Sequence, residues 1–317
     1  MKYTLKRTAC SVTPSPLWAW GSLMLVLAAL LTVLIAACGT SSSETSTAPT
    51  SVPGDRPTAS AVNSAKLPRV TVTAYDYSFA MPTTFAAGLT VVKLVNAGAQ
   101  PHEASFGRVK AGVTVEQVLA AAKRGASAEA YIESLLDFAG GPGVISPHGQ
   151  QETILNLRPG HYVALCFVPG PDGMPHYQMG MITPFTVTTA SGQAPAGEPR
   201  ADAVVKLVNF GYVMPASLKK GDLIKVVNQG TEAHEMVIVE PAPGKTEQDI
   251  LAWLSKPSGP PPFLFVGGMS PIAAGSADWL MLSLNPGRYV ALCAITDPAT
   301  GKQHFMLGMI YPFTVQA

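Results

Sequence analysis

Two of the four cysteines in this 317-residue chain stand in matching surroundings of side chains that bind metals. Each has a histidine well upstream, a second histidine a short way downstream, and a methionine five residues after that. Two imidazoles, one thiolate and a weak axial thioether form the ligand set of copper centres that transfer electrons. The candidate ligands are His102, Cys166, His176 and Met181 in a first set and His234, Cys293, His304 and Met309 in a second.

Cys166 and Cys293 also allow a plainer interpretation, because free cysteine is among the most frequently buried residue types. The whole set occurs twice in register, which favours metal sites, although duplication of one accident stays open. A disulfide between the two cysteines is not expected, since equivalent positions of successive domains usually lie too far apart for a bridge. Neither cysteine has an acidic partner at matching positions, so nucleophilic catalysis has little support.

The segments that must position these residues are written twice. Residues 159–166, Pro-Gly-His-Tyr-Val-Ala-Leu-Cys, recur as Pro-Gly-Arg-Tyr-Val-Ala-Leu-Cys at residues 286–293, and both copies end on Pro-Phe-Thr-Val. The offsets between the copies are 127 to 133 residues, which is the size of a whole domain. We therefore predict one domain at residues 67–190 and another at 201–317, joined by a linker at 191–200.

Short segments rich in Val, Thr, Tyr and Phe, separated by Gly and Pro, indicate strands. Thr114 and Thr246 each begin a helical segment with Gln or Asp three residues later, as in a capping box. A second helix is expected at residues 128–138. Many short strands favour antiparallel sandwiches or barrels of Greek-key type. The predicted fold class is all-β, with two tandem Greek-key units that each carry a short helical insertion.

The charge balance limits the possible partners. The chain has 21 Lys and Arg against 20 Asp and Glu, for a formal net charge of +1. Binding to nucleic acid depends on clustered basic side chains. We therefore expect no nucleic-acid partner.

Residues 1–37 have the pattern of a signal peptide, because three basic residues precede an uninterrupted apolar run at residues 17–37. The run is also long enough to span a bilayer, so an uncleaved anchor is the alternative. Its end, Ile-Ala-Ala-Cys, resembles the bacterial lipobox, which implies that Cys38 is lipidated. Residues 38–66 would then be the lipidated cysteine and a flexible tether. Under both interpretations the protein is attached to a bacterial membrane and its folded part lies on the extracytoplasmic side.

Residues 160–166 and 287–293 resemble the Gly-x-Tyr-x-x-x-Cys strand of the cupredoxins, the plastocyanin-like blue-copper proteins. Residues 96–102 and 228–234 resemble the loop that carries the first histidine in that family. The resemblance covers both predicted domains. It implies two copper ions per chain, held by the eight residues named above. Met179 is a rival axial ligand in the first domain, where the second domain has Leu307.

The sequence also departs from the family. Glu103 and Glu235 follow the first histidines, where the family usually has a supporting Asn. Leu165 and Leu292 precede the cysteines, where copper nitrite reductases and multicopper oxidases place a histidine that bridges to a second copper centre. The resemblance therefore implies that no catalytic copper is present, and we expect that the chain is not an enzyme.

The leading hypothesis is a membrane-tethered, extracytoplasmic copper-binding protein with one type 1-like site per domain. It would transfer single electrons or hold copper, and its partner would be a redox or copper-handling protein. The rival hypothesis is a metal-free module that uses its inserted helices to bind a protein partner. The glutamate after each first histidine favours the rival, while the cysteine kept in both copies opposes it.

Overall fold

The structure is a computed structural model that describes residues 63–125, 128–189 and 197–317. Strands dominate these residues, which confirms the predicted all-β fold. The predicted signal peptide, Cys38 and most of the tether and linker lie outside the described residues. None of the helices in the described part of the chain combines the length and apolar character that a membrane span requires.

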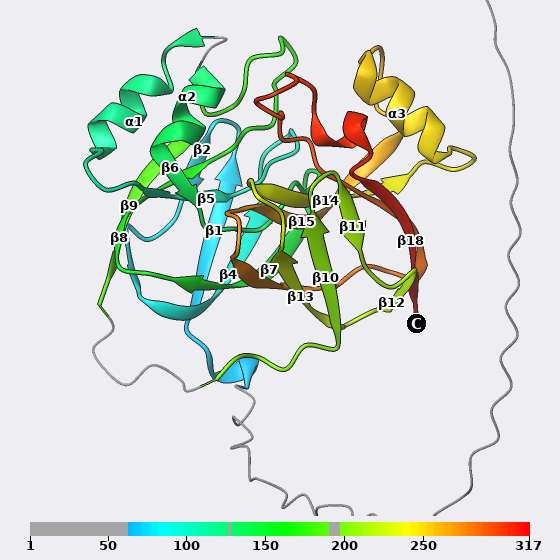
Figure 1. Ribbon diagram of the computed structural model, residues 1–317, viewed down its shortest axis with the longest axis horizontal. Coiled ribbons are helices and arrows are strands. Elements are labelled where there is room, and N and C mark those ends of the chain that lie inside the picture. Colours follow the sequence, from blue (N-terminus) through cyan, green and yellow to red (C-terminus); the bar gives the residue numbers. More distant parts are fainter. Residues whose placement is uncertain (1–62, 126–127, 190–196) are drawn as a thin grey trace, which may run out of the picture. The chain divides into compact units, whose positions relative to one another are not determined.

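An eight-stranded sheet runs through both halves of the described chain, residues 63–189 and 197–317 (Figure 1). Each half contributes four strands, and the halves join where β16 pairs antiparallel with β7. In spatial order the strands are β11 (Gly211–Val213), β10 (Ala203–Val208), β13 (Leu223–Asn228), β16 (Ala277–Met281), β7 (Gln150–Leu157), β4 (Gly88–Asn96), β1 (Arg69–Tyr75) and β2 (Ser78–Ala80).

Each half also has a five-stranded sheet of its own. In the N-terminal half its strands are β3 (Thr84–Ala86), β9 (Ile182–Thr188), β8 (Gly160–Leu165), β5 (Ser105–Val109) and β6 (Leu136–Phe138). In the C-terminal half they are β12 (Ser217–Lys219), β18 (Ile310–Gln316), β17 (Gly287–Leu292), β14 (His234–Pro241) and β15 (Phe263–Ile272).

The chain enters these sheets in the same order in both halves. Strands one, two, four and seven of each half lie in the shared sheet, and the other five lie in the half's own sheet. Such repeated crossing between two layers is typical of a Greek-key sandwich. The largest cluster of buried residues includes Cys166, Cys293, Met181 and Met309, so the candidate ligands belong to the core.

Three α-helices occur in the described residues: α1 (Val115–Ala121), α2 (Ala128–Leu135) and α3 (Glu247–Ser255). Thr114 and Thr246 cap α1 and α3, and both capping boxes are complete, as predicted. The described residues also contain the 3-10 helices η1 (Ser64–Lys66) and η3 (His304–Leu307).

The second helix is shorter than predicted. It ends at Leu135, and the residues expected to continue it form β6 instead. Leu136 and Phe138 are buried on either side of exposed Asp137, which is the alternation of a strand, and Phe138 pairs with Gly107 of β5. Pairing with the sheet therefore replaces the last helical turn.

Candidate metal centres

The first candidate centre lies where three segments meet. His102 lies between β4 and β5, where it forms a β-bridge with Ile145, Cys166 directly follows β8, and His176 lies between β8 and β9. All three candidate ligands are fully buried. The Cys166 sulfur is 3.4 Å from Nδ1 of His176 and 3.8 Å from Nδ1 of His102, and the two Nδ1 atoms are 3.1 Å apart. Three donor atoms thus converge on one point.

The second candidate centre repeats this arrangement with His234, Cys293 and His304. The Cys293 sulfur is 3.3 Å from Nδ1 of His304, and the Nδ1 atoms of His234 and His304 are 3.1 Å apart. All three residues are fully buried, and their donor atoms lie within 4.8 Å of one another. The structure therefore brings together each predicted set of two histidines and one cysteine, while metal binding itself stays a prediction.

The predicted axial methionines are tied to the cysteines through the backbone. The N–H of Cys166 donates to the carbonyl of Met181 at 3.2 Å, and the N–H of Cys293 donates to that of Met309 at 3.1 Å. Both methionine side chains are fully buried. The rival Met179 is only half-buried, and its terminal methyl lies close to Gly170. Full burial fits a ligand in the core better for Met181 than for Met179, and the axial role itself stays a prediction.

Hydrogen bonds close the segment between Cys166 and Met181 on itself. The N–H of Tyr177 donates to the Cys166 carbonyl at 2.9 Å, and the N–H of Met181 donates to the His176 carbonyl at 3.0 Å. In the second centre, Phe305 and Met309 donate in the same way to Cys293 and His304, at 2.8 and 2.9 Å. These bonds hold the second histidine beside the cysteine before any ligand is added.

The outer nitrogens of the first pair of histidines face oxygen atoms. Nε2 of His102 is 2.8 Å from Oδ1 of Asp76, and Nε2 of His176 is 3.3 Å from Oε1 of Gln100. The amide nitrogen of Gln100 donates to the Tyr77 hydroxyl at 2.5 Å, which orients its oxygen towards His176.

The second pair is arranged similarly, with Asn209 facing His234 at 3.1 Å and Glu232 facing His304 at 3.6 Å. Sequence reasoning missed these oxygen-bearing residues. Asp76 and Asn209 each occupy the turn after the first strand of their half, so the repeat offset could have paired them.

These outer contacts decide what the inner nitrogens can do. A carboxylate or amide oxygen only accepts, so Nε2 carries the hydrogen and Nδ1 presents a lone pair. In the first centre two such lone pairs then face each other across 3.1 Å beside a sulfur atom, which is favourable only with a positive charge between them. In the second centre Asn209 fixes the lone pair of His234 in the same way, whereas Nε2 of His304 lies too far from Glu232 for a hydrogen bond.

A proton is a poor candidate for that charge, because burial lowers the pKa of His176 and of His234 to about 4. A metal cation fits the donor set. Burial also raises the pKa of both cysteine thiols, so a metal would have to displace the thiol proton.

The glutamates that depart from the family pattern hold the cysteine segments. The carboxylate of Glu103 accepts from the backbone N–H of Phe167 at 3.1 Å, and that of Glu235 accepts from Ala294 at 2.7 Å. Burial raises the pKa of Glu103 to about 7 and that of Glu235 to about 8. The hydroxyl of Ser270 contacts both Glu103 Oε2 and another acceptor, the Pro142 carbonyl, at 3.1 and 3.0 Å. Ser270 has one hydroxyl hydrogen, which it can donate to Pro142, and both contacts are hydrogen bonds if a protonated Glu103 donates to the Ser270 oxygen, which agrees with its raised pKa.

Two glycines allow the first-histidine loops to approach the rings. A Cβ atom on Gly98 would collide with Asp76 and with Nε2 of His102, and one on Gly230 would collide with Asn209 and with Nε2 of His234. The backbone N–H of each glycine donates to the asparagine two residues before it, at 2.9 Å in both loops. The Asn-x-Gly pattern in each copy therefore shapes the loop around its histidine.

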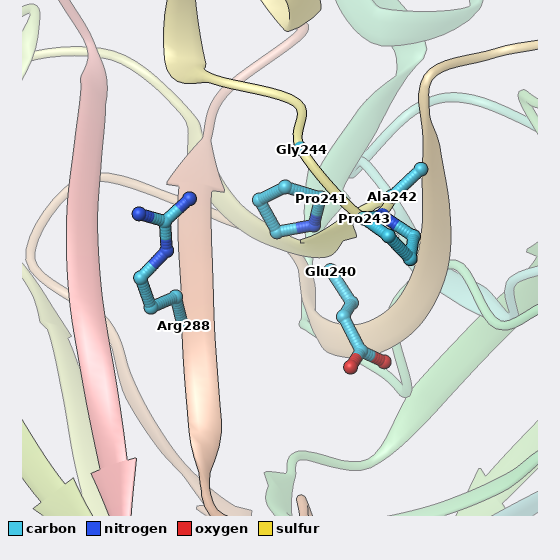
Figure 2. A pocket seen from close by; sticks show the side chains of 6 residues that line it. All are labelled: Glu240, Pro241, Ala242, Pro243, Gly244 and Arg288. Carbon is cyan, nitrogen blue, oxygen red and sulfur yellow. The ribbon is translucent and has the colours of Figure 1, made fainter.

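The remaining features of the sequence lie apart from the centres. His148 and His161, which the repeat excludes from the ligand sets, are both exposed. A surface pocket of about 450 Å³ lies between residues 240–244 and Arg288 (Figure 2). Arg288 is at the start of β17, whereas Cys293 follows its end about 16 Å away by strand geometry. The pocket contains none of the candidate ligands.

Searches with the sequence find no matching family model and no curated relative. Solved structures do match. Auracyanin A, a blue copper protein from Chloroflexus aurantiacus, is 19% identical, with 38% of this chain and 99% of that chain covered and a TM-score of 0.27. A multicopper oxidase is 16% identical, with 79% and 89% covered and a TM-score of 0.25. The copper nitrite reductase of Nitrosomonas europaea is 16% identical, with 79% and 94% covered and a TM-score of 0.24.

These matches correct one prediction. The chain was expected not to be an enzyme, yet two of the three structures are described as a multicopper oxidase and a nitrite reductase, and they cover more of this chain than auracyanin A does. The leucines before Cys166 and Cys293 argue only against a second copper centre that is bridged through a histidine at that position. They do not argue against other types of catalytic centre. The exclusion of enzymatic activity is therefore withdrawn, and TM-scores this low assign no activity in its place.

Proposed function

We propose that the chain is a two-domain, cupredoxin-like copper protein that transfers single electrons. His102, Cys166 and His176 would hold one copper, and His234, Cys293 and His304 would hold another. The observation that carries the proposal is the convergence, in both halves, of a buried sulfur and two Nδ1 atoms 3.1 Å apart. Met181 and Met309 would supply the axial thioethers, and residues 67–190 and 201–317 would be the two domains.

Copper in such a set supplies one-electron chemistry, because it changes between two oxidation states. The chain's own residues keep the site fixed and dry. The backbone bonds from Tyr177 and Met181 hold His176, and Asp76 holds His102 from outside. All three candidate ligands are excluded from solvent. A prearranged, buried ligand set supports electron transfer more than it supports exchange of copper with the surroundings.

Copper titration of the purified chain tests this proposal. We expect about two copper ions per chain, an intense visible absorption from the copper–thiolate bond, and reversible reduction by one electron per copper. His102→Ala should lower the copper content towards one, whereas the matched control His161→Ala should keep two, because His161 is exposed and outside the set. Failure of the folded, reduced chain to take up copper would overturn the proposal. Copper that is lost on reduction would indicate that the chain holds copper and does not transfer electrons.

We also propose that Cys38 is lipidated and that the protein is anchored at the extracytoplasmic face of a bacterial membrane, where a redox or copper-handling protein would be its partner. The support is the Ile-Ala-Ala-Cys sequence at the end of an apolar run, followed by a polar tether. Mass spectrometry of the N-terminal peptide from cells should find an acylated Cys38. A peptide that continues unmodified across Cys38 would contradict the anchor, and Cys38→Ala should release the protein from the membrane fraction.

A further inference from the structure

The two candidate centres differ in the groups that hold their histidines from outside. In the first centre, the carboxylate of Asp76 lies 2.8 Å from Nε2 of His102, within hydrogen-bond distance. An amide oxygen, that of Gln100, accepts from His176 at 3.3 Å. Both imidazoles of the first centre therefore have a hydrogen-bond acceptor, and one of these acceptors is charged.

In the second centre the carboxylate and the amide change places. The amide oxygen of Asn209 lies 3.1 Å from Nε2 of His234, and the carboxylate of Glu232 lies 3.6 Å from Nε2 of His304. That distance is too long for a hydrogen bond, and Nε2 of His304 has no other acceptor among the described residues. The second centre therefore has one hydrogen-bonded imidazole, and its acceptor is neutral.

The two carboxylates also differ in how firmly they are held. The carboxylate of Asp76 accepts from the backbone N–H groups of Ala99 and Gln100 at 3.0 and 3.2 Å, which fixes it against His102. Hydrogen bonds in the described residues give the Glu232 carboxylate no such anchor. Their side chains are similarly exposed, 32% for Asp76 and 27% for Glu232, so screening by solvent does not separate them. The short, anchored contact of Asp76 distinguishes the first centre.

A carboxylate that accepts the outer hydrogen of an imidazole makes the inner nitrogen a stronger donor. A stronger donor stabilises the more highly charged state of a bound metal and so lowers its reduction potential. Charge-assisted hydrogen bonds are also stronger than bonds between neutral groups. The first centre should thus favour the oxidised metal more than the second.

We propose that the two centres hold copper at different reduction potentials, the first lower than the second, and that Asp76 and Asn209 set this order as positioning residues for His102 and His234. The inference rests on the copper binding proposed above. It gives the duplication a consequence: one chain carries two unequal redox centres, and an electron entering at the first would have a favourable direction towards the second.

The test uses two parent variants of the full chain, each of which keeps one cysteine. Cys293→Ser leaves the first centre and Cys166→Ser leaves the second, and a redox titration followed by visible absorption gives one potential for each. We expect the lower potential in the Cys293→Ser parent. Asp76→Asn in that parent should raise the potential, and Asn209→Asp in the other parent should lower it.

Loss of an outer partner typically weakens metal binding 10- to 100-fold. If the loss falls on the oxidised state, each tenfold change shifts a one-electron potential by about 59 mV.

Asp137→Asn in the Cys293→Ser parent is the matched control, because it removes an exposed aspartate of the same half that does not contact a histidine. Its potential should equal that of the parent. Copper content is measured for every variant. Two results in parents that bind one copper per chain would overturn the inference and leave the proposed function standing. One is an order of potentials that is the reverse of the expected one. The other is that neither Asp76→Asn nor Asn209→Asp changes the potential. Parents that bind no copper would overturn both.

Discussion

Glu103 accepts a hydrogen bond of 3.1 Å from the backbone N–H of Phe167, so the residue after a candidate histidine ligand holds the residue after the candidate cysteine ligand. Glu235 and Ala294 repeat the relationship in the other half at 2.7 Å. The glutamates had favoured a metal-free module. Their contacts show that each supports the segment of its cysteine, a role that fits a metal-binding protein as well as a metal-free one.

Glu103→Ala should destabilise the protein by about 1–3 kcal/mol, because it leaves the partly buried N–H of Phe167 without an acceptor and removes a fully buried carboxyl. Glu103→Gln should lose less, since its amide keeps an oxygen for Phe167 and offers an N–H to Ser270. Urea unfolding of the metal-free protein measures both. An alanine variant as stable as the wild type would show that this hydrogen bond contributes nothing to stability.

The stability of the metal-free protein should fall as the pH rises from about 6.5 to 8. Burial raises the folded-state pKa of Glu103 and Asp278 to about 7 and that of Glu235 to about 8. Groups with a raised folded-state pKa contribute stability at low pH and lose it as the pH passes that pKa. The slope should reach about 1.4 kcal/mol per pH unit for each carboxyl that still holds its proton.

Buried histidines act in the opposite direction but at lower pH. The folded-state pKa of His176 and of His234 is lowered to about 4, so their contribution is complete above about pH 6.5 and is lost only as the pH falls towards 4. Glu235→Gln should flatten the decline above pH 6.5, whereas Glu240→Gln, an exposed site on the same strand, should not. Equal slopes for the two variants would contradict this account of the decline.

Gln151 links the two halves through paired hydrogen bonds with Gly268. Its amide nitrogen donates to the Gly268 carbonyl at 2.6 Å, and its oxygen accepts from the Gly268 N–H at 2.9 Å. Gln151→Ala should cost about 1–3 kcal/mol, because the buried N–H of Gly268 loses its acceptor and the Gly268 carbonyl keeps only the N–H of Gly143, at 3.1 Å. The neighbouring Gln150 is exposed, so Gln150→Ala should change the free energy of unfolding little. Similar losses for both variants would argue against the link.

Met181→Leu and Met309→Leu should change the reduction potential of their centres more than the copper content. The axial thioether is a weak ligand that tunes redox behaviour, and leucine conserves the volume of a buried side chain. Copper analysis and a redox titration measure the two quantities. A loss of copper as large as that caused by His102→Ala would mean that methionine is a principal ligand.

The sequence predicted the fold and the grouping of each cysteine with its two histidines because both depend on local patterns that occur twice. The strand that ends at Cys166 and the capping residues Thr114 and Thr246 each have a local signature, and the structure confirms these elements. The repeat placed His102 and His234 in the same role, although each lies far from its cysteine in the chain. Duplication thus supplied long-range information that a single copy would have lacked.

The outer contacts could not be predicted in the same way. Asp76 reaches His102 across a separation of 26 residues, through a turn after β1 that folds against the first-histidine loop. In the other copy the carboxylate moves to Glu232, beside the other histidine. The repeat offset pairs the positions, Asp76 with Asn209 and Gln100 with Glu232, but the carboxylate and the amide exchange places, so the copies share no residue type that would mark the contact. The strand of residues 136–138 was missed because its pairing with β5 is also a tertiary contact.

Copper content and visible absorption of four full chains test the central claim most directly: the wild type, Cys166→Ser, Cys293→Ser and the double variant. The account predicts about two, one, one and no copper ions per chain. Each single variant should keep the copper–thiolate absorption of the remaining centre, and the double variant should have none. Both cysteines are buried and free, so serine changes the sulfur with little change in shape. Copper content and absorption that do not depend on Cys166 and Cys293 would contradict the account.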